Sequence, residues 1–206
     1  MMIIEVYFDG LCQPYNPGGI ACYAFVIKEF SGGRSHEKKH TIHSDYGLAA
    51  EPFTDDATNN VAEYTAIIKA LEWLLQNPDT CNNTNNQIVI KGDSKLVINQ
   101  LLGEYKIKAP RIIPLYQKAT SLLSKFKEDI IQIEWVPREK NAEADKLSYK
   151  AYREVLENNP ALLQKVSQYM ATDKQLQLLK SLGITPEKHL SKSEASRLLS
   201  KMTKPI

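Results

Sequence analysis

The sequence predicts an α/β protein with one mixed five-stranded sheet, helices flanking the sheet, and a small helical extension at the C-terminus. Short runs of β-branched and aromatic residues separated by turn signals open the chain. Segments with apolar residues at helical spacing follow and alternate with two further short strands. Strands joined by tight turns pair antiparallel, whereas strands separated by helices are usually parallel, so the sheet should contain both kinds of pairing.

Three strands are expected at the N-terminus. The run IIEVYF is rich in β-branched and aromatic residues and ends at an Asp-Gly turn signal, and the sequence NPGG then reverses the chain into a strand with alternating apolar positions. A polar stretch follows, in which a third strand is harder to delimit. The predicted strands cover residues 3–8, 20–30 and about 39–43, and a loop is expected over residues 44–56.

Helices and two short buried strands make up the rest of the main domain. The clearest helix follows asparagines that can cap it and carries apolar residues at three- and four-residue spacing. The predicted helices cover residues 61–75, 95–102, about 110–126 and 141 to about 156, and the predicted strands cover residues 88–90 and 130–136.

The character of the chain changes after residue 158, which divides it into a main domain of residues 1–158 and an extension of residues 159–206. Capping-box patterns begin at Thr172 and at Ser191, and each precedes an apolar stripe. Two short helices of this kind are too small to fold well alone. The extension could bind phosphate groups through its basic residues or pack on the main domain for stability.

Composition and charge limit the function classes. Of the 206 residues, 43% are hydrophobic and 24% are charged, as in ordinary globular proteins. No apolar run approaches the roughly 20 residues of a membrane span, and the N-terminus lacks the pattern of a secretory signal, so we expect no membrane partner and a cytoplasmic location. Cys12, Cys22 and Cys81 are scattered without metal-ligand spacing and are predicted to be reduced thiols.

The charges are unevenly distributed, although the formal net charge is only +2. Residues 91–127 hold eight basic residues against two acidic ones, and residues 160–206 hold eight against three, so the remainder is acidic. Basic stretches suit phosphate contacts and an acidic region suits divalent cations, although solvated helix faces explain the same pattern.

Four carboxylates occur at informative places. Asp9 ends the first predicted strand, and Asp93 follows the strand of residues 88–90. Glu63 lies on the core-facing stripe of its helix, and Asp145 lies in the first turns of the last helix of the main domain. Each alone could be a turn former or a carboxylate favoured by the helix dipole.

Together the four acids predict a metal site. If the first and fourth strands are neighbours at the centre of the sheet, both aspartates lie side by side and the helix acids can close over them. Such carboxylates repel one another unless cations neutralise them. Oxygen ligands without His or Cys favour Mg²⁺, with Mn²⁺ as the alternative. Two ions about 3.5 to 4 Å apart can stabilise the attacking water and the leaving oxygen in a phosphoryl displacement.

The motifs around these acids resemble those of type 1 ribonucleases H, in the same order, over about residues 1–155. TNNVAEY is the most specific, and the full set is FDG, NPGG, TNNVAEY, GDS, LVINQ, GEY and NAEAD. The resemblance implies a ribonuclease H-like fold and a metal-binding acid tetrad of Asp9, Glu63, Asp93 and Asp145. It also implies a monomeric endonuclease that hydrolyses the RNA strand of RNA/DNA hybrids with two metal ions, leaving 3′-hydroxyl and 5′-phosphate ends.

The resemblance also suggests residues that contact the substrate. In that family, the positions of Gly10, Asn16, Asn59 and Asn60 contact sugars and phosphates near the cut. Amides that both donate and accept suit the 2′-hydroxyls that only the RNA strand exposes. Helix capping by the two adjacent asparagines and turn formation by Asn16 are the structural alternatives.

Two features depart from the common bacterial pattern. A histidine precedes the last aspartate in many members, but residues 135–141 (WVPREKN) form a short segment without one, as in a shorter-looped archaeal-like branch. Arg138 is the candidate to replace that histidine, unless it is an ordinary surface charge. The basic helical protrusion is also missing, and Lys106, Lys108 and Arg111 are candidates for a reduced phosphate contact.

Two other functions compete with this prediction. A resolvase or transposase of the same fold would keep an acidic cluster without needing the TNNVAEY motif. A hybrid-binding module that has lost catalysis would be indicated by loss of an acid, but the tetrad is intact in the sequence.

Overall fold

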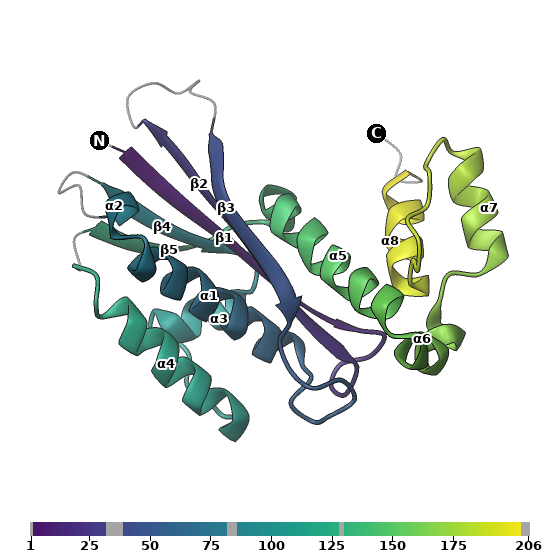
Figure 1. Cartoon of the computed structure of the whole chain (residues 1–206), viewed down its shortest axis with the longest axis horizontal. Helices are drawn as coiled ribbons and strands as arrows, with labels where there is room; N and C mark the ends of the chain where they lie inside the picture. The colour runs from purple at the N-terminus through teal and green to yellow at the C-terminus, as the bar shows by residue number, and fades with distance from the viewer. Residues whose placement is uncertain (1, 32–38, 82–85, 128–129, 203–206) are drawn as a thin grey trace. The chain divides into compact units, whose positions relative to one another are not determined.

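The computed structural model describes residues 2–31, 39–81, 86–127 and 130–202, without the side chains of Ser31 and Cys81. The chain forms two compact units, Met1–Tyr152 and Arg153–Ile206 (Figure 1). The division falls inside helix α5 (Ala142–Asn158), whereas the boundary predicted from the sequence is the C-terminal end of that helix.

The N-terminal unit contains the predicted mixed five-stranded sheet. Its order is β3-β2-β1-β4-β5, with antiparallel β3–β2 and β2–β1 pairs and parallel β1–β4 and β4–β5 pairs. The first and fourth strands are therefore neighbours, as the metal-site hypothesis required. The strands are β1 (Met2–Gln13), β2 (Ile20–Ser31), β3 (His40–Leu48), β4 (Gln87–Gly92) and β5 (Ile131–Trp135).

Two predicted strand ends are wrong. Asp9 does not end the first strand: β1 continues to Gln13 because its pairing with β2 runs the whole length of the hairpin, and Asp9 pairs with Ala24. The pairing with β4 stops at Phe8, so Asp9 is the residue of β1 that directly follows the last β4 partner. The third strand reaches Leu48, inside the predicted loop, because β2 provides backbone partners that far.

Helices pack against both faces of this sheet (Figure 1). The helical segments of the unit are α1 (Asn59–Gln76), α2 (Pro78–Cys81), α3 (Lys95–Leu101), η1 (Pro110–Ile112), α4 (Ile113–Leu123), η3 (Arg138–Asn141) and the first part of α5. Helix α1 begins where the Thr58 side chain accepts a hydrogen bond from Val61 N. It buries apolar residues against the sheet in one core, which includes Ile4, Val6, Phe8, Ile67, Leu71 and Leu74.

Alternation along β1 places Glu5, Tyr7 and Asp9 on the face opposite to this core. The first turns of α5 lie on that face, where Glu143 forms an ion pair with Lys28 of β2 at 2.7 Å. Cys12 and Cys22 are free buried thiols, as predicted, whereas the side chain of Cys81 lies outside the described part.

The C-terminal unit is helical. Its segments after α5 are α6 (Pro160–Val166), η4 (Ser167–Tyr169), α7 (Asp173–Ser181) and α8 (Lys192–Met202). The capping box predicted at Thr172 is present, and Ser191 Oγ accepts a hydrogen bond from Glu194 N at 3.1 Å. Leu179, Leu190 and Ala195 form its small core. Within the described residues of the chain, none of the helices has the length and apolar character needed to cross a membrane.

Candidate active site

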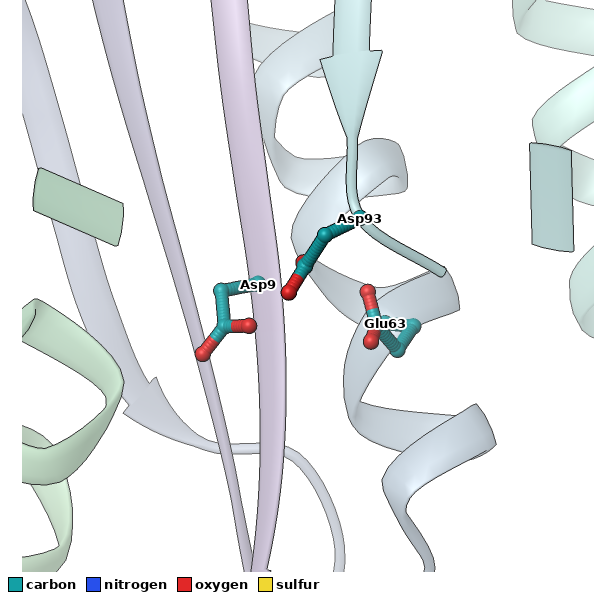
Figure 2. A group of neighbouring side chains, drawn as sticks. All are labelled: Asp9, Glu63 and Asp93. Atoms are coloured by element: carbon teal, nitrogen blue, oxygen red, sulfur yellow. The ribbon is translucent and has the colours of Figure 1, made fainter. Parts of the chain in front are cut away.

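Three of the predicted acids come together where β1 and β4 part. Asp9 lies on β1, Asp93 follows β4 and Glu63 lies on α1 (Figure 2). One carboxylate oxygen of each lies within 4.8 Å of the other two. Gly10 permits this close approach, because a Cβ atom there would lie 2.3 Å from Glu63 N. The structure thus gives Gly10 a role in packing β1 against α1, and its contact with substrate stays a prediction.

The surroundings of Asp9 and Glu63 disfavour the charged forms of these two acids. The exposed fractions are only 5% for Asp9 and 7% for Glu63. Burial, together with the nearby charges of Asp93 and Asp145, raises the pKa of Asp9 to about 7. Burial and the charges of Asp9 and Asp93 raise the pKa of Glu63 well above its ordinary value.

Glu63 Oε2 is buried and has no hydrogen-bond partner among the described residues. A buried carboxylate oxygen without a donor is costly unless a cation reaches it. Two further carboxylates face the same point, and none of the three residues is a His or Cys. The donor set therefore fits a hard divalent cation such as Mg²⁺ or Mn²⁺.

Side chains outside the acid tetrad hold these acids in place. Asn141 Nδ2 donates to Asp93 Oδ1 and to the carbonyl of Phe8, both at 2.8 Å. Ser148 Oγ is hydrogen bonded to Asp9 Oδ2 and lies 2.9 Å from the carbonyl oxygen of Asp145. Neither Asn141 nor Ser148 was predicted from the sequence to hold an acid in place. The position of Ser148, one helical turn after Asp145 and on the same helix face, is the signal that could have identified it.

Asp145, the fourth predicted acid, is not one of the three that share a point. Arg138 Nη2 forms an ion pair with Asp145 Oδ1; Arg138 lies in the η3 turn just before α5, and Asp145 lies in the first turn of α5. The charge of Asp145 still contributes to the raised pKa of Asp9, so the two acids are close enough to interact. Arg138 therefore lies at the site, as predicted, but in contact with an acid of the tetrad.

A cleft of about 330 Å³ opens over the acids. No histidine is among its described lining residues, which are Asp9, Gly10, Leu11, Cys12, Gln13, Asn59, Asn60, Glu63, Asp93, Ser94, Arg138 and Tyr149. Asn60 also borders a second cavity of about 520 Å³, which is lined in part by Tyr105, Lys106 and Lys108. The two cavities thus meet at a residue predicted to contact substrate.

The predicted substrate asparagines have different surroundings. Asn16 Oδ1 accepts a hydrogen bond from Asn59 N at 3.1 Å, so Asn16 itself holds the start of α1, a role that the sequence alternatives gave to Asn59 and Asn60. Asn59 Oδ1 is buried and has no hydrogen-bond partner among the described residues. Asn16 thus uses its acceptor within the protein, whereas the buried acceptor of Asn59 lacks a donor among the described residues.

The chain is similar to known families and proteins. A family model described as "Reverse transcriptase-like" matches residues 44–151. A bifunctional protein of Mycobacterium tuberculosis is 40% identical over 95 residues, which cover 46% of this chain and 24% of that protein. Ribonuclease HI of Halobacterium salinarum is 34% identical over 148 residues, which cover 72% of this chain and 63% of that protein. The chain thus spans less than two thirds of the length of either relative.

Solved structures show the same fold. LC11 RNase H1, isolated from compost by a metagenomic approach, is 30% identical with a TM-score of 0.61, and the match covers 76% of this chain and 99% of that one. A structure of LC11 RNase H1 in complex with an RNA/DNA hybrid matches with a TM-score of 0.58 and 29% identity over the same shares of both chains.

Proposed function

Because the chain belongs to the type 1 ribonuclease H family, we propose that it is an endonuclease that hydrolyses the RNA strand of RNA/DNA hybrids. The observation that carries this proposal is the group of Asp9, Glu63 and Asp93, whose carboxylate oxygens converge on one point and of which Asp9 and Glu63 are buried. A hybrid bound to the similar LC11 RNase H1 supports the choice of substrate.

We further propose that Asp9, Glu63 and Asp93, with Asp145 joining them, hold two Mg²⁺ ions, for which Mn²⁺ could substitute. Such ions would stabilise the attacking water and the leaving oxygen in an in-line displacement at phosphorus that leaves 3′-hydroxyl and 5′-phosphate ends. The protein fixes the orientation of the carboxylates. Asn141 holds one oxygen of Asp93, and Ser148 holds one oxygen of Asp9, so the remaining oxygens stay directed toward the cleft.

The cleft and its neighbouring cavity supply contacts suited to a hybrid. Asn59 and Asn60 line the cleft beside the acids, where their amides can test for a 2′-hydroxyl. Tyr105 is 51% exposed in the second cavity and offers a ring to a sugar or base, and Lys106 and Lys108 line the same cavity. Phosphate groups of the second strand are the natural partners of these lysines.

All four acids of the tetrad are present and three converge, which supports an enzyme over a hybrid-binding module without catalysis. A resolvase or transposase activity is the other alternative. A monomeric state and a cytoplasmic location stay predictions.

The test is a cleavage assay on matched RNA/DNA, RNA/RNA and DNA/DNA duplexes, with Mg²⁺ or with EDTA. The proposal predicts cuts in the RNA strand of the hybrid alone or at the highest rate, only with the metal, and with 5′-phosphate on the products. Cleavage of DNA/DNA duplexes with no preference for the hybrid would instead support the resolvase or transposase alternative. Binding of the hybrid without any cut would support the non-catalytic module.

A further inference from the structure

We propose that Arg138 is a built-in counter-cation that keeps Asp145 from binding metal in the free protein. On this view the free protein takes one divalent ion at Asp9, Glu63 and Asp93, and Asp145 becomes available for a second ion only when a substrate phosphate draws Arg138 away. This inference rests on the proposed metal site and adds to it an order of binding.

The ion pair itself is the first observation. Arg138 Nη2 binds Asp145 Oδ1, and the Asp145 side chain is 8% exposed whereas that of Arg138 is 50% exposed. The guanidinium group therefore reaches a buried carboxylate from the solvent side. While it is bound, it competes with any other cation for that oxygen.

The second observation is the charge of the cleft. Among its described lining residues Arg138 is the single cationic side chain, and it faces the same space as Asp9, Glu63 and Asp93. Arg138 thus supplies to the acids part of the compensation that a divalent ion would supply.

A phosphate group can replace the carboxylate of Asp145 as the partner of the Arg138 guanidinium. A planar guanidinium binds carboxylates and phosphates with the same forked geometry. A backbone phosphate of a nucleic acid in the cleft would compete with Asp145 for Arg138. Because such coupling is reciprocal, the hybrid should tighten binding of the second ion, and the second ion should tighten binding of the hybrid.

The experiment is calorimetric titration of the free full-length protein with Mn²⁺, comparing wild type with Arg138→Met and Arg138→Lys. Lys140→Met is the matched control, because it removes the same charge from an exposed position in the same η3 turn. We expect one ion for wild type, Arg138→Lys and Lys140→Met. Arg138→Met should gain a second ion, or bind the second at least about fivefold more tightly. Equal stoichiometry and affinity in wild type and Arg138→Met, or weaker binding in the variant, would overturn the inference.

Asp93→Asn separates this inference from the proposed function. If Asp93→Asn binds Mn²⁺ as wild type does, the three-acid site is wrong. If Asp93→Asn loses the ion while Arg138→Met behaves as wild type, the metal site stands and only the role of Arg138 fails. Thermal unfolding gives an independent readout: Mn²⁺ should raise the Tm of Arg138→Met by more than it raises that of Lys140→Met, and equal increases would contradict the proposal.

Discussion

Glu5 and Asp9 are two buried carboxylates on one strand, with exposed fractions of 3% and 5%, and they face the same side of the sheet. Their partners differ. The carboxylate of Glu5 accepts hydrogen bonds from Lys39 Nζ, from Lys91 Nζ at 2.7 Å and from Tyr7 Oη at 2.9 Å. Asp9 accepts a hydrogen bond from Ser148 and lies close to Glu63 and Asp93.

The pKa values shift in opposite directions for this reason. Burial raises the pKa of both acids, but the hydrogen bonds from Lys39 and Lys91 outweigh burial at Glu5 and bring its pKa below the ordinary value. At Asp9 the neighbours are acids, and the pKa rises to about 7. The protein itself compensates the charge of Glu5, whereas Asp9 and its neighbours leave room for a cation from solution.

The largest expected effect is on catalysis at the uncompensated site. Asp93→Asn should lower Mg²⁺-dependent cleavage of an RNA/DNA hybrid about a thousandfold or more, equivalent to about 4 kcal/mol of transition-state stabilisation. The fold should persist, because an asparagine Oδ1 can still accept the hydrogen bond from Asn141. Single-turnover kinetics and circular dichroism measure the two effects, with the exposed Asp79→Asn as control. Cleavage at near wild-type rates would show that Asp93 is misassigned.

The pH dependence of stability should reveal the raised pKa of Asp9. Without metal, native Asp9 keeps its proton up to about pH 7, whereas the unfolded chain releases it near its ordinary pKa, so wild type loses stability as pH rises through this window. Asp9→Asn lacks this loss. Its free energy of unfolding relative to wild type should therefore increase from pH 4 to pH 8, by up to about 4 kcal/mol. Urea unfolding in EDTA at each pH measures this difference, and parallel curves for the two proteins would contradict it.

Glu5→Gln should lower the free energy of unfolding, whereas Asp9→Asn should raise it. Removing one partner of a buried ion pair leaves the lysines poorly compensated, and we expect a loss of about 3 kcal/mol in the free energy of unfolding at neutral pH. Lys39 is partly exposed, which should limit the loss. Cleavage per folded molecule should stay at the wild-type rate, because Glu5 takes no part in the cleft. An unchanged free energy of unfolding in Glu5→Gln would contradict the stabilising role given to the ion pairs of Glu5.

The smallest changes in stability are expected for Asn16→Ala and Asn59→Ala, which differ in whether the lost oxygen has a hydrogen-bond partner. Asn16→Ala removes an acceptor at the start of α1 and should cost about 1 kcal/mol of stability. Asn59→Ala removes a buried oxygen without a partner, so stability should change less, while the preference for RNA/DNA over DNA/DNA duplexes falls. Paired urea unfolding and cleavage assays compare the variants. A loss of stability in Asn59→Ala with unchanged cleavage would make this residue purely structural.

Sequence patterns located the acids because each follows or faces a recognisable strand or helix. The strand order and the convergence of Asp9, Glu63 and Asp93 followed from that placement. The pairing of Asp145 with Arg138 depends on a short 3₁₀ turn, η3, whose side-chain geometry no periodicity encodes. The end of β3 could not be predicted from its polar residues, because the pairing with β2 defines where the strand stops.

The sequence also gave no sign that Glu5 is compensated. In the run IIEVYF it has the appearance of an ordinary polar position of an alternating strand. Its partners come from before β3 and from within β4, so their convergence depends on the completed sheet.

Whether Asp9, Glu63 and Asp93 bind a cation from solution can be tested directly. Crystals of the free protein grown with Mn²⁺ should give an anomalous difference peak in contact with oxygens of all three side chains, including Glu63 Oε2. Asp145 should remain paired with Arg138 in the same crystals. The absence of an anomalous peak at these three residues under saturating Mn²⁺, with Glu63 Oε2 bound instead to a protein donor, would contradict the account.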